Sequence, residues 1–129
     1  MNKLHIIQED YKEDPWKVLV CCILLNQTNN TQVRPLIQKF FDRWPNSESI
    51  EIEECSIISQ FIKTTGFQNV KAKRIKDFSF CWSRGERDTS KFPGIGKYGK
   101  EAWRIFVDND FNFIPTDKKL KMYLEIYKA

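Results

Sequence analysis

The sequence predicts a single all-α domain, and three observations lead to that prediction. Its 129 residues suit one compact domain, so we take residues 1–129 as one unit. Apolar side chains recur at the spacing of α-helices along most of the chain. Only residues 111–114 alternate as a strand does, and four residues do not make a sheet. With 41% hydrophobic and 14% aromatic residues, the chain can bury a sizeable core.

The first two predicted helices have clear boundaries. Asp14 is a favourable N-cap, Pro15 suits the first helical position, and residues 16–25 are apolar on almost every side. That pattern indicates a central, buried helix. Residues 33–44 follow, with apolar side chains spaced 3, 1, 3, 1 and 3 apart, which is typical of an amphipathic helix. Pro45 ends it.

Later segments carry the same helical signals. Residues 50–62 predict a helix that is closed by Gly66. Residues 70–82 predict another, with lysine and arginine along one side. Two more helices are predicted, at 97–107 and from near Asp117 onward, with Thr116 or Pro115 at the start of the last one.

The overall charge is mildly basic. A net charge of +4 and a pI of about 8.9 are compatible with a polyanionic partner but do not identify one. The longest apolar run, residues 18–25, is far too short to span a bilayer. Charged residues interrupt any apolar stretch at the start, so neither a secretory signal nor a membrane partner is expected.

The four cysteines stand at positions 21, 22, 55 and 81, and no pair has C-x-x-C spacing. We expect buried, reduced thiols in an intracellular protein rather than a disulfide or metal framework. His5 is the only histidine, and one imidazole alone does not build a zinc site. The sequence therefore predicts no metal site.

A glycine motif raises the first functional question. The segment FPGIGKYGKEAWRIF (92–106) contains G-x-G-x-x-G at Gly94, Gly96 and Gly99, and Asp117 follows eighteen residues later. That arrangement is the fingerprint of dinucleotide binding, but the fingerprint requires a buried strand before the first glycine. Here the preceding residues, SRGERDTSKFP, are charged and end in proline. The dinucleotide interpretation is therefore excluded.

The alternative is a hairpin between two helices. Gly94 and Gly96 permit a tight turn with positive φ, in which backbone N–H groups can approach an anion closely. The helix that starts near Lys97 points its positive end at the same place, so a nucleic-acid phosphate suits the turn. On this segment alone, an ordinary Pro-Gly turn before a helix explains the pattern equally well.

Several motifs in one order extend that interpretation. P-G-I-G, an amphipathic helix and an aspartate about twenty residues on resemble the helix–hairpin–helix superfamily of DNA base-excision glycosylases. ILLNQT (23–28) and GFQNVKAKRI (66–75) are similar to two further segments of that superfamily, and the likeness spans residues 8–123. Within it, the chain resembles the thymine/uracil mismatch glycosylase domain of methyl-CpG-binding proteins, through IIQEDYKEDPWKVL (6–19), GIGKYGKEAWRIF (94–106) and IPTDKKLKMY (114–123).

The resemblance implies a reaction and its residues. Asp117 matches the family's catalytic aspartate, although an aspartate after Pro-Thr also suits a simple helix cap. Bifunctional relatives carry a lysine where this chain has Tyr98, which implies a monofunctional enzyme that removes a base without cutting the strand. Gln8 matches the glutamine of the base pocket, and Tyr98 would line the same pocket.

The same resemblance assigns DNA contacts. Gln27 matches the residue that fills the gap left by a flipped base, and Phe67 matches the apolar wedge. The mismatch-specific branch often has arginine at the position of Gln27, so the preference for guanine opposite the base stays open. Phe67 is equally compatible with a core residue at a helix end. Phosphate contacts are expected from Gly94, Gly96, Lys97, Lys119 and Lys71. For each lysine a solvated helix face is the alternative.

The implied protein is a monomer with the helix–hairpin–helix glycosylase fold, acting in the nucleus on double-stranded DNA with a G:T or G:U mismatch. No metal or organic cofactor is implied. Because no cysteine follows Cys81, the four-cysteine iron–sulfur cluster of many superfamily members is not expected. Three alternatives remain open: a non-catalytic DNA-binding module, a glycosylase for an alkylated or oxidised base, and a protein-interaction domain.

Overall fold

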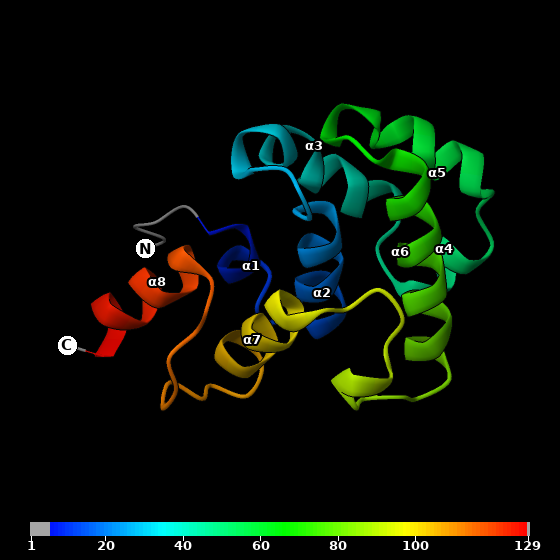
Figure 1. Cartoon of the computed structure of the whole chain (residues 1–129). Coiled ribbons are helices and arrows are strands. Elements are labelled where there is room, and N and C mark those ends of the chain that lie inside the picture. The colour runs from blue at the N-terminus through cyan, green and yellow to red at the C-terminus, as the bar shows by residue number, and fades with distance from the viewer. Residues whose placement is uncertain (1–5, 129) are drawn as a thin grey trace.

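The computed structural model describes residues 6–128, which are helical with no strand in that range (Figure 1). The all-α prediction is therefore confirmed. His5 lies outside the described residues. The elements, in chain order, are α1 (Ile7–Asp10), α2 (Pro15–Leu24), α3 (Asn30–Arg43), α4 (Ser47–Glu51), α5 (Cys55–Phe61), the 3₁₀ turn η1 (Lys63–Thr65), α6 (Gln68–Ser83), the 3₁₀ turn η2 (Thr89–Lys91), α7 (Lys97–Phe106) and α8 (Lys118–Lys128).

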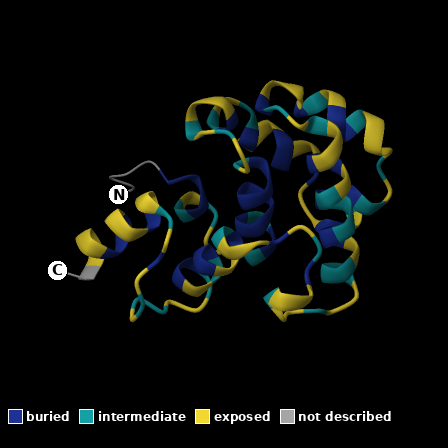
Figure 2. Cartoon of the chain, viewed as in Figure 1, coloured by how far each residue is buried: buried dark blue, intermediate teal, exposed yellow. Residues whose placement is uncertain are grey.

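The central helix is α2, as the sequence predicts. The Asp14 side chain accepts a hydrogen bond from the Lys17 N–H, and Pro15 occupies the first turn. Of the helix residues, Pro15 and Lys17 alone are not buried, so α2 is dark blue along most of its length in Figure 2. Helices α1, α3, α6 and α7 pack against it. A hydrogen bond of 3.0 Å from Trp16 Nε1 to Ser79 Oγ joins α2 to α6.

The region predicted as one helix over 50–62 is two helices, α4 and α5, and the single-helix prediction is wrong. Asn46 caps α4 through its side chain. The break centres on Glu53, whose carboxylate lies beside the Trp44 indole and accepts its Nε1–H at 3.1 Å. The Glu54 N–H donates to the same carboxylate at 3.2 Å, which takes this amide out of a helical ladder.

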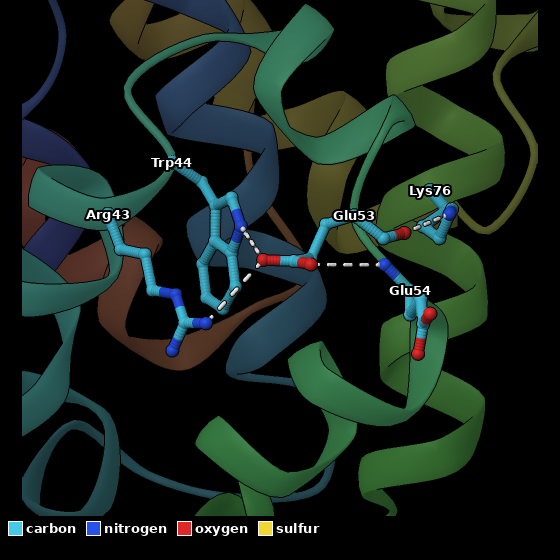
Figure 3. Close-up of polar contacts among 5 residues, drawn as sticks. All are labelled: Arg43, Trp44, Glu53, Glu54 and Lys76. Carbon is cyan, nitrogen blue, oxygen red and sulfur yellow. Dashed lines mark hydrogen bonds and ion pairs between the residues drawn. The ribbon is translucent and has the colours of Figure 1, made fainter.

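Glu53 also connects α3 to α6. Figure 3 shows the group, here called the Glu53 cluster: Arg43, Trp44, Glu53, Glu54 and Lys76. Arg43 forms an ion pair of 3.6 Å with the Glu53 carboxylate, and the Lys76 ammonium donates to the Glu53 backbone carbonyl. The cluster fixes the corner where α3, α4, α5 and α6 meet, at the opposite end of the molecule from α8 (Figure 1).

The other end of the molecule is built from α7, α8 and α1. The Phe106 and Tyr123 rings, 5.1 Å apart, join α7 to α8. Within residues 6–128, no helix has both the length and the apolar content needed to cross a bilayer. Cys21 and Cys22 are buried free thiols, as predicted, but Cys55 is exposed at the start of α5, so the prediction of a buried thiol is wrong there.

Candidate functional site

Two adjoining hollows lie beside the N-terminus of α7. The first, here called the hairpin hollow, has a volume of about 440 Å³ and is lined by Cys22, Ile23, Asn26, Arg74 and residues 94–99. The second, the aspartate hollow, has a volume of about 320 Å³ and is lined by residues 25–30, Tyr98, Asp117 and Lys119. Asn26 and Tyr98 line both, so they form the boundary between the hollows.

The aspartate hollow brings together four predicted site residues from separate segments. Gln27 comes from the loop after α2, Tyr98 from the first turn of α7, and Asp117 and Lys119 from the start of α8. Asp117 caps α8: its Oδ2 accepts the Leu120 N–H at 3.0 Å. Its Oδ1 accepts no hydrogen bond from residues 6–128, which leaves this oxygen for a bound molecule. Capping and a reactive role are therefore compatible in one side chain.

Gln8 and Tyr98 meet although they are 90 positions apart in the sequence. Gln8 Nε2 donates to the Tyr98 hydroxyl at 2.6 Å and to Cys22 Sγ at 3.5 Å. Gln8 is completely buried, and its Oε1 has no hydrogen-bond partner among the described residues. A buried acceptor without a donor is costly, and the side chain therefore has unused capacity for a ligand donor.

The two titratable groups that contact Gln8, the Cys22 thiol and the Tyr98 phenol, stay protonated near neutral pH. Burial raises the pKa of the Cys22 thiol to about 12 and places the pKa of the Tyr98 phenol well above its ordinary value. The negative charge of Asp117 contributes to both shifts, which shows that the three groups are neighbours. Asp117 is the only carboxylate among the residues that line the two hollows.

The hairpin before α7 has one glycine with positive φ. Gly94 has φ +76°, and a Cβ there would lie 2.9 Å from Arg74 Cγ, so only glycine fits. Gly96 has φ −93°, so the prediction of positive φ is right for Gly94 and wrong for Gly96. Gly96 instead serves as the N-cap of α7, and no side chain of the described residues caps the first N–H groups of this helix. Those groups open onto the hairpin hollow, where Lys97 also lies.

Gln27 and Phe67 share an uncommon backbone conformation. Their φ angles are +54° and +50°, in the left-handed region that costs most residues free energy. Both side chains are exposed, and Phe67 keeps 57% of its surface accessible. The alternative of a core role for Phe67 is therefore wrong. The ring is therefore accessible from solvent and lies on a turn with a strained backbone.

The family follows from comparison with known proteins. Residues 20–122 match the family described as HhH-GPD superfamily base excision DNA repair protein. The chain belongs to this superfamily. Its fold is accordingly the helix–hairpin–helix fold of that group, with the hairpin at residues 92–97.

Individual relatives agree with the superfamily assignment. Over 121 residues, or 92% of the chain, the sequence is 31% identical to the Methyl-CpG-binding domain protein 4-like protein of Arabidopsis thaliana. It is 31% and 29% identical to thymine/uracil-DNA glycosylases of Pyrobaculum aerophilum and Methanothermobacter thermautotrophicus, over 66% and 68% of the chain. A solved thermostable thymine-DNA glycosylase matches with a TM-score of 0.69 and 27% identity over 74% of the chain and 48% of the solved one. The chain spans 27%, 40% and 43% of the lengths of the three sequence relatives.

The prediction that Lys71 contacts a DNA phosphate is wrong. Lys71 is completely buried, and its Nζ donates to the Leu24 carbonyl at 2.8 Å and to the Thr65 carbonyl at 2.9 Å. An ammonium in this position does not reach a phosphate on the surface. Burial lowers its pKa from 10.5 to about 8. By contrast, Lys97 and Lys119 are exposed and line the two hollows.

Sequence reasoning missed Asn26, Cys22 and Glu101 as site residues. Asn26 and Cys22 can be assigned to the site only from the structure, which places the C-terminal end of α2 and the loop after it beside the hairpin. Glu101 did carry a signal, because an acidic residue stands on the buried face of a strongly amphipathic helix, one turn from Ile105. A charge at a core position needs partners, and for Glu101 these are Thr116 and Asp117.

Proposed function

We propose that the chain is a monofunctional DNA glycosylase that removes thymine or uracil mispaired with guanine from double-stranded DNA. The observation that carries the proposal is the aspartate hollow. There a carboxylate oxygen that accepts no hydrogen bond from residues 6–128 shares one cavity with Tyr98 and Gln27. Similarity to two thymine/uracil-DNA glycosylases supports the same reaction. We expect a monomer that acts on chromosomal DNA, which in a eukaryotic cell means in the nucleus.

The proposed reaction is hydrolysis of the N-glycosidic bond. As that bond breaks, positive charge develops on the deoxyribose, and the Asp117 carboxylate stabilises it from the hollow. Asp117 Oδ1 then accepts a proton from water, whose oxygen bonds to C1′, while the base leaves as an anion and takes a proton from solvent. The hydrogen bond from the Leu120 N–H to Oδ2 holds the carboxylate in one orientation during both steps.

Base recognition is assigned to Gln8 and Tyr98. Thymine and uracil present one N–H donor and two carbonyl acceptors, and a glutamine amide can pair with both kinds of group. Gln8 Oε1, which has no hydrogen-bond partner in the part of the chain that the structure describes, is the acceptor proposed for the base N–H. Tyr98 lines both hollows and contacts Gln8, so the entering base would replace the Gln8–Tyr98 hydrogen bond and pack against the phenol.

The monofunctional character rests on Tyr98. A strand-cutting relative needs an amine nucleophile for a Schiff base with the sugar. The Tyr98 phenol is neutral because burial raises its pKa, and it contains no amine. We therefore expect an abasic site as the product, with strand cleavage only after alkali treatment.

DNA would be held at four places, three at the hollows and one at Phe67. The uncapped N-terminus of α7 suits a backbone phosphate, with Gly94, Gly96 and Lys97 around it and Lys119 on the next hollow. Flipping a base leaves a gap in the duplex, and the exposed Gln27 beside Asp117 is placed to fill it. Phe67 is the proposed wedge between neighbouring bases.

Single-turnover base release tests the proposal. Wild type should release the base from G:T and G:U duplexes but not from matched ones. Asp117→Asn should slow release by roughly 10²–10⁴-fold, because it removes the charge and the proton acceptor. The amide oxygen still caps α8, so we expect this variant to fold and to bind DNA.

The matched control is Asp14→Asn, the same change at the N-cap of α2. We expect its release rate to stay within about twofold of wild type, because asparagine caps as well as aspartate does. DNA binding without base release by wild type would contradict the enzyme proposal and leave a DNA-binding module. Release only from an alkylated or oxidised base would contradict the proposed substrate.

A further inference from the structure

Glu101 is a buried carboxylate that faces the residues just before α8. Only 7% of its surface is exposed. Its Oε2 accepts the Thr116 N–H at 2.9 Å and the Thr116 hydroxyl at 3.2 Å, and its Oε1 accepts the Asp117 N–H at 3.4 Å. Among residues 6–128, no lysine or arginine forms an ion pair with it. The charge is therefore balanced by backbone and hydroxyl donors alone.

One of these donors, the Asp117 N–H, stands where a helix needs an acceptor, and Thr116 comes directly before it. The N–H groups at the start of α8 have no partner inside the helix and carry its positive end. Glu101 supplies that acceptor from α7, across the loop that joins the two helices. Asp117 is then fixed twice: its N–H donates to Glu101, and its Oδ2 accepts from Leu120. Its Oδ1 alone accepts no hydrogen bond from the described residues.

We propose that Glu101 is a positioning residue for base excision, one that fixes the start of α8 so that Asp117 Oδ1 points into the aspartate hollow. This role rests on the proposed function of Asp117. A displacement of about 1 Å at a reacting group can lower a rate by roughly 10²-fold, even when the displaced residue never touches substrate. Glu101 itself lines neither hollow beside Asp117 and would not contact the sugar.

The chain folds without relying on Glu101 alone. The Phe106–Tyr123 ring contact at 5.1 Å joins α7 to α8 independently. Glu101→Gln keeps the shape of the side chain and one acceptor oxygen, but it turns an NH₂ group toward the donors of Thr116. This variant should therefore fold with a looser start of α8, and Asp117 should lose its fixed orientation.

The experiment is a double-mutant cycle in the whole chain, with wild type, Glu101→Gln, Asp117→Asn and the double variant. Single-turnover release from a G:T duplex is measured together with the Kd for a duplex whose mismatched thymidine carries 2′-fluorine and resists hydrolysis. We expect Glu101→Gln to release base about 10–100-fold more slowly. Its Kd should stay within about threefold of wild type, since the phosphate contacts lie elsewhere.

The cycle separates positioning from an independent role. If Glu101 acts only through Asp117, the double variant should be no slower than Asp117→Asn by more than about twofold. Losses that multiply would overturn the proposal, because they would show a separate action of Glu101. A loss that appears only in Kd, or an unchanged release rate, would overturn it as well.

Glu53→Gln is the matched control. Glu53 is also a partly shielded carboxylate that holds a loop through backbone and side-chain donors, but it belongs to the cluster in Figure 3 at the far corner of the molecule. Glu53→Gln should lower the Tm about as much as Glu101→Gln does. Its rate of base release should stay within about twofold of wild type. If wild type itself releases no base, the proposed function fails and this role with it. If wild type and Glu101→Gln release the base equally fast, the positioning role of Glu101 fails and the proposed function stands.

Discussion

The candidate site is held by two buried charges of opposite sign, Lys71 on α6 and Glu101 on α7. Neither forms an ion pair within residues 6–128, and both bind groups at the ends of helical segments. Lys71 donates to carbonyls at the C-terminal ends of α2 and η1, whereas Glu101 accepts N–H groups at the N-terminus of α8. The sign of each charge matches the helix end that it binds.

The two regions differ in what they connect. The carbonyls bound by Lys71 belong to Leu24 and Thr65, which lead into the turns carrying Gln27 and Phe67. One ammonium therefore ties two distant parts of the chain together inside the core. Glu101 holds a single short segment across one loop. We therefore expect Lys71 chiefly to support the fold, whereas the role proposed for Glu101 is to orient Asp117.

The largest expected difference between the two regions is in stability. Lys71→Met keeps the length of the side chain but leaves the Leu24 and Thr65 carbonyls without a donor. We expect the free energy of unfolding to fall by about 3 kcal/mol, since each unsatisfied buried acceptor costs roughly 1–3 kcal/mol. Urea unfolding of both proteins at pH 7 measures the change.

Lys73→Met on the same helix is the control for Lys71→Met. The Lys73 side chain is 72% exposed and pairs with Asp77 at 2.7 Å, so its loss should lower the free energy of unfolding far less than the loss of Lys71 does. Equal stability of the two variants would contradict the supporting role of Lys71. A Lys71→Met protein as stable as wild type would show that hydrophobic packing replaces the ammonium at no cost.

A smaller effect follows from the pKa of Lys71, which burial lowers from 10.5 to about 8. Below about pH 8 the folded and unfolded chains both hold this proton. Between about pH 8 and 10.5 only the unfolded chain holds it, so the free energy of unfolding rises with pH in this window. Relative to Lys71→Met, we expect wild type to gain roughly 1–3 kcal/mol between pH 7.5 and 10.

Loss of the proton from Lys71 should leave its hydrogen bonds to the Leu24 and Thr65 carbonyls in place. A neutral lysine amine still has two N–H donors, one for each carbonyl. Subtracting the curve of Lys71→Met removes the contributions of tyrosines that titrate in the same range. A difference curve that is flat from pH 7.5 to 10 would show that the ammonium is as well solvated in the folded protein as in the unfolded chain.

Local signals were enough to predict most of the helices. Asp14 and Pro15 begin α2, and the apolar period of residues 33–44 agrees with α3, which the structure places at Asn30–Arg43. The break between α4 and α5 could not be predicted in this way. It depends on the Glu53 carboxylate reaching Trp44, nine residues earlier, and on Lys76, which lies 23 residues later.

The site shows a similar division. Hairpin glycines and Asp117 were found by motif and resemblance, and the structure places Asp117 with Tyr98 and Gln27 in one hollow. Lys71 was misassigned because its helix carries several basic residues, and only tertiary packing decides which of them is buried. Its partner Leu24 lies 47 positions away, a distance at which no local pattern reports a contact.

The smallest expected effect on stability concerns Phe67, which follows the segment held by Lys71. Phe67→Gly removes an exposed ring and relieves the positive φ of +50°, so the free energy of unfolding should change by less than about 1 kcal/mol. Base release from G:T duplexes should nevertheless slow by roughly tenfold, because no apolar group then enters the base stack. Urea unfolding and single-turnover release measure the two quantities.

The control for Phe67→Gly is Phe80→Ala. Alanine is used because Phe80 lies inside α6, where glycine costs about 1 kcal/mol relative to alanine. The Phe80 ring is 51% exposed on α6, the helix that follows Phe67, and the Arg84 guanidinium lies 3.9 Å from its centroid. Phe80 lines neither hollow. The release rate of Phe80→Ala should match wild type. If Phe67→Gly also released base at the wild-type rate, the strained turn would serve neither stability nor catalysis, and the support that Lys71 gives it would concern the fold alone.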